Sequence, residues 1–201
     1  MLIGLATLAA LLSVPLLGGR LMALADVRFR AAWLAPLAIG MQILIINVTP
    51  QDAGTLHRLV HLASYAVLAA LVVLNHRRLA FLWLIALGGA ANLVAIAAND
   101  GVMPASASAL RAAGVVQTPG DFINSAPVAD AHLQFLGDVF AVPSWMPISN
   151  VFSVGDVLIV LGALLAFHTI GRSRPAVAIE RRISAARTAR VETTAGARST
   201  A

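Results

Sequence analysis

The chain has 201 residues, of which 59% are hydrophobic and only 11% are charged. A soluble domain carries about 25% charged residues, so this composition excludes an ordinary soluble domain and predicts an integral membrane protein. The absence of cysteine excludes a disulfide, a cysteine nucleophile and a thiolate metal site.

Five apolar runs have about the 17 to 20 residues needed to cross a hydrocarbon core of roughly 30 Å. In chain order they cover residues 1–17, 33–48, 56–74, 79–98 and 151–170. No positive segment precedes the first run and Arg20 follows it, the reverse of a signal peptide, so we expect an uncleaved helix. The sequence therefore predicts an all-α, polytopic membrane bundle of five transmembrane helices over residues 1–170.

The arginines predict the orientation of this bundle. Twelve of the fourteen lie in the first loop, the third loop and the C-terminal tail, which five crossings place on one side. Short loops rich in arginine stay cytoplasmic. We therefore expect a membrane protein with its N-terminus outside and its C-terminus in the cytoplasm. Trp33 and Trp83 would lie at the inner interface and Trp145 at the outer one, as an aromatic belt requires.

Two segments are not predicted to span the membrane. The outer loop, residues 99–150, is too long for a plain connector, and its apolar content indicates a partly folded cap on the bundle. The basic tail, residues 171–201, is expected to be disordered and attracted to anionic lipid. An amphipathic helix over residues 176–191 is the alternative. No nucleotide or nucleic-acid motif is present, so we expect neither a cofactor nor a nucleic-acid partner.

The triplet Gly-Asp-Val occurs twice and supplies two candidate site residues. It places Asp138 in the outer loop and Asp156 about one and a half turns inside the fifth helix. An ionisable side chain within a span is costly and marks a functional site. A carboxylate near a helix start can also cap the free N–H groups, so both interpretations of Asp156 stay open. The small Gly155 beside it allows a neighbouring helix to approach closely.

A third carboxylate, Asp100, follows the fourth apolar run. The sequence Asn99-Asp100-Gly101, with Pro104 close behind, is typical of a helix stop and a turn. Alternatively, Asp100 would reach the depth of Asp156, and the two carboxylates could share a proton as an acid–base pair. Asn92, deeper in the fourth helix, is expected to form a hydrogen bond between helices.

His57 and His61 are spaced i, i+4, which places both rings on one face of the third helix. Such a pair binds zinc or copper only with further ligands, for which Asp52 and His132 are the candidates. Because interfacial histidines are common, the pair is a weak metal candidate and we predict no metal.

Four motifs resemble a family of bacterial membrane proteins, domain of unknown function 5317. They are GGRLMALADVRFRAAWL (18–34), NDGVMPAS (99–106), FLGDVFAVP (135–143) and NVFSVGDVLIVLG (150–162). The resemblance covers roughly residues 1–172 and implies a protein of the bacterial inner membrane, but no activity. We expect its motif residues to hold the cap against the helix ends; they are Asn99, Gly101, Pro104, Gly137, Pro143, Asn150 and Gly155.

The last motif alone is also similar to lipoprotein signal peptidases, which use two aspartates at the outer membrane surface. By this likeness Asp138 and Asp156 match the two catalytic aspartates, and Asn150 matches the asparagine of the motif. The sequence departs from that family at Val139, where an arginine would follow the first aspartate. It also has an extra helix, and Asp138 lies far along the loop from the fourth helix.

Three classes of function remain from the sequence. The leading one is a non-enzymatic bundle that binds a membrane or envelope protein partner. The first alternative is an intramembrane hydrolase that uses an aspartate pair drawn from Asp100, Asp138 and Asp156. The second is a small-solute or ion carrier, although polar residues within the spans are few and no span after the first is broken in its middle by Gly or Pro.

Overall fold

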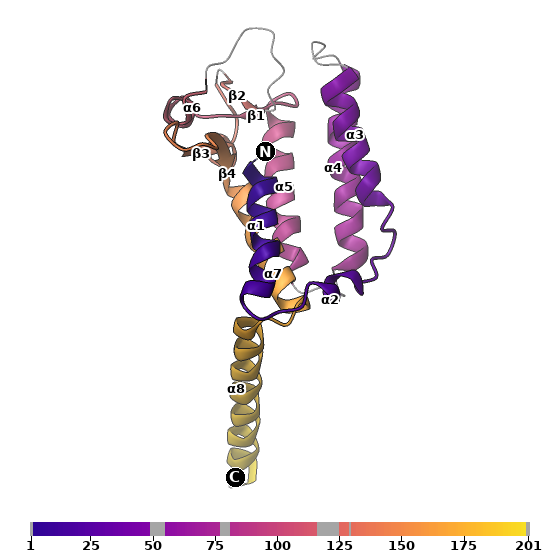
Figure 1. Cartoon of the computed structure of the whole chain (residues 1–201), viewed down its shortest axis with the longest axis vertical. Helices are drawn as coiled ribbons and strands as arrows, with labels where there is room; N and C mark the ends of the chain where they lie inside the picture. Colours follow the sequence, from indigo (N-terminus) through magenta and orange to yellow (C-terminus); the bar gives the residue numbers. More distant parts are fainter. Residues whose placement is uncertain (1, 49–54, 77–80, 116–124, 129, 200–201) are drawn as a thin grey trace.

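A computed structural model describes residues 2–48, 55–76, 81–115, 125–128 and 130–199; within these ranges it does not describe the side chains of 42, 45–48, 55–58, 61 and 191–199. The described chain is mostly helical, as predicted. The long apolar helices are α1 (Leu2–Leu16), α3 (Leu34–Val48), α4 (Thr55–Asn75), α5 (Leu82–Ala98) and α7 (Val154–Ile170). They run up and down side by side (Figure 1) and coincide closely with the five apolar runs.

That the bundle spans a membrane, and with how many helices, stays a prediction. Taken one at a time, none of the helices in the described residues combines the length and hydropathy needed to cross a membrane. Among the described residues, α7 and the first part of the helix that follows it (Arg174–Arg190) pass that test only when they are taken together, and the chain bends by 82° between them.

Small residues bring α5 and α7 together, and this pair has the most extensive helix contact in the bundle. A Cβ atom added to Gly155 would overlap the Asn92 side chain and lie 2.6 Å from the carbonyl oxygen of Gly88. Gly88 meets the backbone of α7 in the same way. Because neither backbone can retreat without separating the helices, both positions need glycine. Elsewhere α1 packs against α7, α3 against α4, and α4 against α5.

The described part of the segment between α5 and α7 folds as a cap at the end of the bundle where the N-terminus lies (Figure 1). It contains β1 (Met103–Pro104), α6 (Ala107–Ala113), β2 (Ser125–Ala126), the 3₁₀ helix η1 (Gln134–Leu136), β3 (Asp138–Val142) and β4 (Asn150–Ser153). β1 pairs in parallel with β2, and β3 pairs antiparallel with β4. The expectation of an all-α fold is therefore corrected by two short sheets, which satisfy backbone groups of a segment too rich in Pro and Gly to be helical.

The β3–β4 hairpin changes the position of the second aspartate. Phe140 and Phe152 stack across it with ring centroids 5.4 Å apart, and Asp138 pairs with Ser153. Because residues 150–153 belong to β4, the fifth long helix begins at Val154 rather than at residue 151. Asp156 consequently lies in the first turn of α7, shallower than predicted.

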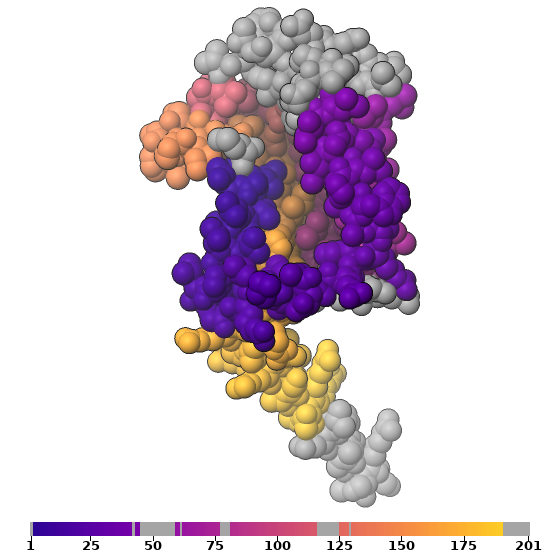
Figure 2. Space-filling model, turned by 45° about the vertical axis from the view of Figure 1, so that its right-hand side comes forward, coloured from indigo at the N-terminus to yellow at the C-terminus, as the bar shows by residue number. Residues whose placement is uncertain are grey.

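The opposite end of the bundle carries α2 (Met22–Ala25) and α8 (Arg174–Ser199). The tail thus differs from the expected disordered segment, since α8 includes all of residues 176–191; alanine and arginine both favour helix. Backbone bonds join the ends of α1 and α7 here, with Arg20 N–H donating to Gly171 O over 2.8 Å. Figure 2 shows α8 projecting away from the bundle.

Candidate functional site

A buried hydrogen-bond network joins α5, α7 and the end of β4. The Asn92 amide donates through Nδ2 to Asp156 Oδ1 over 2.7 Å, and its Oδ1 accepts from the Ser153 hydroxyl over 2.8 Å. All three side chains are buried, with Ser153 at 0% exposure. This contact between helices agrees with the role expected for Asn92 and gives it a specific partner.

The same network caps α7. The Ser153 hydroxyl oxygen accepts from the backbone N–H of Asp156 over 3.0 Å, and Asp156 Oδ2 accepts from the backbone N–H of Ser153 over 3.0 Å. This reciprocal pair is a capping box, which satisfies two otherwise unpaired N–H groups. Both oxygens of Asp156 are therefore engaged, one along α7 and one across to α5. The carboxylate also lies where the helix dipole favours negative charge.

Asp138 occupies a different environment from Asp156. It is 4% exposed at the start of β3, and the Ser125 hydroxyl donates to its Oδ2. Its carbonyl oxygen accepts from the backbone N–H of Ser106 over 3.0 Å. Burial raises the pKa of the Asp138 carboxyl to about 6, the Ser125 bond opposes that rise, and the nearby Asp156 charge adds to it.

Tyr65 of α4 completes the surroundings of the two carboxylates. It packs against the buried cluster of Ala95, Ile96 and Met103, and it lies within electrostatic range of both Asp138 and Asp156. The site is thus built from α4, α5, α7 and two segments of the cap. It lies where the cap meets the helix ends.

Asn99 ties the end of α5 to a distant part of the cap. Its Oδ1 accepts from the His132 N–H over 2.9 Å, and its Nδ2 donates to the His132 carbonyl oxygen over 2.7 Å. The next residues turn the chain: Asp100 has φ 57° and Gly101 has φ 86°. Asp100 is exposed, so the structure does not bring it into the buried pair as the acid–base alternative requires. The helix stop and turn expected here is what the structure shows.

The remaining motif residues shape the cap backbone. A Cβ atom on Gly137 would overlap the carbonyl oxygen of Pro104, which is fully buried, so glycine lets the two segments touch. The carbonyl oxygen of Pro143 accepts from the Met146 N–H over 3.0 Å and closes a turn. The side-chain oxygen of Asn150 accepts from the neighbouring Val151 N–H over 2.9 Å, and its backbone pairs with Val142 in the β3–β4 hairpin. It is separate from the Asp156 network.

The proposed metal ligands cannot be assigned. His57 and His61 lie on α4, but their side chains are outside the described residues, as is Asp52. No group of three or more His, Asp or Glu side chains that could hold a metal ion occurs in the part of the chain that the structure describes.

An apolar groove of about 380 Å³ reaches Asp156 between α1 and α7. Leu2 and Ala6 line it from α1, Leu161 from α7, and Val142 and Phe152 from the cap. Asp156 therefore faces the Asn92 amide on one side and an apolar surface on another. Such an opening suits an acyl chain or an apolar peptide segment, because it offers almost no hydrogen-bonding groups.

The model of a family of unknown function (DUF5317) matches residues 26–168. The chain belongs to this family. The match confirms the resemblance drawn from the four motifs and covers α3, α4, α5, the cap and most of α7. No curated protein and no solved structure matches the chain significantly. The DUF5317 match carries no activity, so function has to be argued from the site.

Sequence reasoning missed several partners in this site. Ser125 and Tyr65 approach the carboxylates from segments far away in the chain, and no local pattern indicates that. Ser153, which caps α7, is not among the predicted site residues either. The signal that could have selected it is Ser153-x-x-Asp156, the spacing of a capping box.

Proposed function

We propose that this DUF5317 member is a non-enzymatic integral membrane bundle, with its cap outside the cytoplasm, that binds a membrane or envelope protein partner through the cap. The observation that carries the membrane part is apolar exposure on every long helix. Examples are Leu12 of α1 (52% exposed), Ile39 of α3 (58%), Val73 of α4 (65%), Leu87 of α5 (53%) and Val157 of α7 (45%). A soluble monomer rarely exposes large apolar side chains on every one of its helices.

The distribution of charge and tryptophan supports the orientation. Of the arginines whose side chains are described, all but Arg111 lie in or beside α2 and α8, the end away from the cap (Figure 1). Trp33 and Trp83 are exposed at that end, whereas Trp145 is 80% exposed in the cap. Arginine favours the cytoplasmic side and exposed tryptophan favours the interfaces. The helices have 15 to 21 residues, so the bundle suits a thin or locally thinned bilayer.

The absence of cysteine provides a direct test of this topology. Single cysteines placed at two exposed positions, Ser144→Cys in the cap and Thr188→Cys on α8, would be labelled with a membrane-impermeant maleimide in spheroplasts. We expect labelling at 144 in intact spheroplasts and at 188 only after permeabilisation. Labelling of 188 from outside, or release of the protein by alkaline carbonate, would contradict the proposal.

The cap offers an apolar surface for a partner. Phe135 (65% exposed), Trp145 (80%) and Met146 (40%) belong to a cap whose backbone is fixed by the Asp138, Asn99 and Asp156 bonds. Rigid aromatic residues are typical anchors of protein interfaces. A photo-crosslinking residue at Phe135, with Ala107 on the exposed side of α6 as control, should give a protein adduct of one defined mass only at 135. Adducts to lipid alone would contradict partner binding.

One observation favours a second candidate, the aspartate-pair hydrolase. Asp138, whose pKa is raised by burial, lies near Asp156, a second buried carboxyl that accepts from two donors, and neighbouring carboxyl groups are the catalytic pair of aspartate hydrolases. The apolar groove would bind an apolar substrate and place the bond to be hydrolysed at Asp156. If this candidate is correct, the wild-type protein hydrolyses such a bond. Asp156→Asn should then abolish the hydrolysis, while the variant keeps the unfolding temperature of the wild type.

A further inference from the structure

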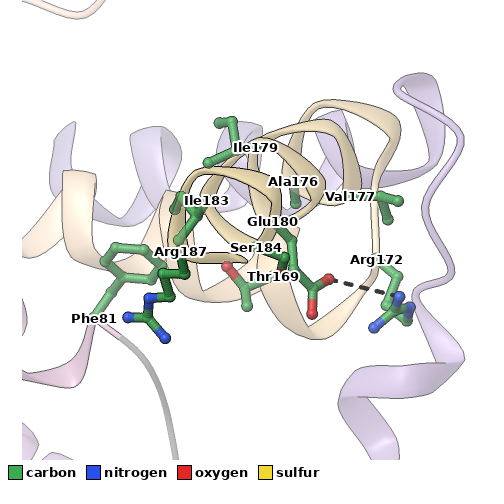
Figure 3. Close-up of a pocket in the computed structure, with 10 residues that line it drawn as sticks. All are labelled: Phe81, Thr169, Arg172, Ala176, Val177, Ile179, Glu180, Ile183, Ser184 and Arg187. Atoms are coloured by element: carbon green, nitrogen blue, oxygen red, sulfur yellow. Dashed lines mark ion pairs between the residues drawn. The ribbon is translucent and has the colours of Figure 1, made fainter. Parts of the chain in front are cut away.

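A second groove of about 380 Å³ lies at the end of the bundle opposite the cap. The end of α7, the first turns of α8 and the residue before α5 line it. Figure 3 shows Phe81, Ile183 and Arg187 beside one another, while Glu180 reaches toward Arg172. The groove therefore combines apolar and cationic side chains, which the groove at Asp156 does not.

The polar side of this groove suits an anion. Arg172 pairs with Glu180 over 3.6 Å, and within the described part of the chain no carboxylate pairs with Arg187. The hydroxyls of Thr169 and Ser184 line the same groove. Guanidinium and hydroxyl groups together donate several hydrogen bonds to a phosphate.

The apolar side of the groove suits a hydrocarbon chain. Ile179 and Ile183 are spaced i, i+4 on α8 and are 56% and 50% exposed. Phe81 stands next to them at the start of α5, the foot of the apolar bundle. An apolar stripe flanked by arginine is the pattern of a helix that lies at a lipid surface.

We propose that this groove binds one anionic phospholipid of the inner leaflet, with its headgroup phosphate at Arg187, Ser184 and Thr169 and an acyl chain along Ile183 and Phe81. This proposal rests on the proposed membrane insertion, and it adds a binding site for one class of lipid to the inserted protein. A second copy of the chain is disfavoured as the occupant, because residues 174–190 of α8 carry five arginines and one glutamate. Two such helices repel each other, whereas an anionic lipid complements them.

The test uses full-length protein in nanodiscs of phosphatidylcholine with or without phosphatidylglycerol. Lipid retained by the protein is counted by native mass spectrometry, and affinity is measured by phosphatidylglycerol titration in detergent. Arg187→Gln is compared with Arg182→Gln, an exposed arginine on the same helix that does not line the groove. We expect Arg187→Gln to weaken phosphatidylglycerol binding about fivefold and Arg182→Gln to change it less than about twofold.

Several results would overturn this inference. Equal losses in both variants would mean diffuse attraction to the tail, and displacement by millimolar inorganic phosphate would mean a site for the free ion. Preference for an acidic peptide over phosphatidylglycerol would mean a protein site. Flotation of proteoliposomes of the same lipid compositions separates the two proposals: insertion without phosphatidylglycerol preference overturns only the lipid site, whereas failure to insert overturns the proposed function.

Discussion

Asn92 and Asp156 are 64 residues apart in the chain and are joined by a buried 2.7 Å hydrogen bond between α5 and α7. The bond is possible because Gly155 lets the two helices touch. Through Ser153 it continues to the β3–β4 hairpin, where Ser153 pairs with Asp138. The carboxylate of Asp156 therefore connects the cap to the bundle.

Ser153→Ala should destabilise the fold. It removes the cap of α7 and leaves the buried Asn92 Oδ1 without its donor, at a cost of about 1 to 3 kcal/mol. The measurement is the free energy of unfolding in detergent. Thr188→Ala, which removes an exposed hydroxyl on α8, is the control and should change it by less than about 0.5 kcal/mol. Equal effects of the two changes would refute a capping role.

Gly155→Ala should separate α5 from α7. The added methyl overlaps the Asn92 side chain and the Gly88 backbone, so we expect a loss of about 1 to 3 kcal/mol in unfolding free energy. Gly89→Ala is the matched control, because nothing lies within 4 Å of its Cβ position on α5. In a helix interior that change should be neutral or stabilising by up to about 1 kcal/mol. Wild-type stability of Gly155→Ala would show that the helices do not pack this closely.

The raised pKa of Asp138 predicts a pH dependence. Its folded-state pKa of about 6 exceeds the ordinary 3.8, so between these values the folded chain holds a proton that the unfolded chain has released. This stabilisation is complete below 3.8 and is lost as the pH rises through about 6, with a slope of at most about 1.4 kcal/mol per pH unit.

Asp138→Asn isolates this contribution from those of the other carboxylates. The variant should lack the fall in stability over that window and should be at least as stable as the wild type at neutral pH, because an amide imitates the neutral acid. Unfolding curves at pH 4, 5, 6 and 7 provide the comparison. Parallel pH profiles for the two proteins would count against a raised pKa.

Asn99→Ala should loosen the cap locally. It removes both bonds to the His132 backbone, so the cap should open more often and limited proteolysis within residues 99–150 should become several times faster. Asn150→Ala is the control within the cap, since Asn150 bonds to the adjacent Val151 N–H. Similar cleavage rates in the two variants would argue that Asn99 does not hold the cap.

The long helices could be predicted from sequence, but the site only in part. Apolar runs end at turn residues such as Gly101, so hydropathy locates α5 to within a few residues. The depth of Asp156 could not be predicted, because residues 150–153 look like a continuation of an apolar helix. They form a strand only because β3 is there to pair with them.

Long-range partners set the rest of the site. Asn92 could be predicted to bond across helices, since a polar side chain among apolar ones needs a partner, but its partner depended on the packing of α5 on α7. Ser125 and Tyr65 reach the carboxylates through the cap and through α4, which sequence spacing does not encode. The helical tail was underestimated because its arginines suggested a solvated chain.

A double-mutant cycle of Asn92→Ala and Asp156→Ala measures how much stability comes from the bond between the two side chains. Because the two side chains share one buried bond, we predict that each change alone destabilises the protein and that the double variant loses less than the sum by about 1 to 3 kcal/mol. Additive effects, or unchanged or raised stability of Asp156→Ala, would show that the carboxylate does not hold the cap to the bundle. The carboxylate would then be retained at a cost to stability, as functional groups often are, and hydrolysis would be the activity to test.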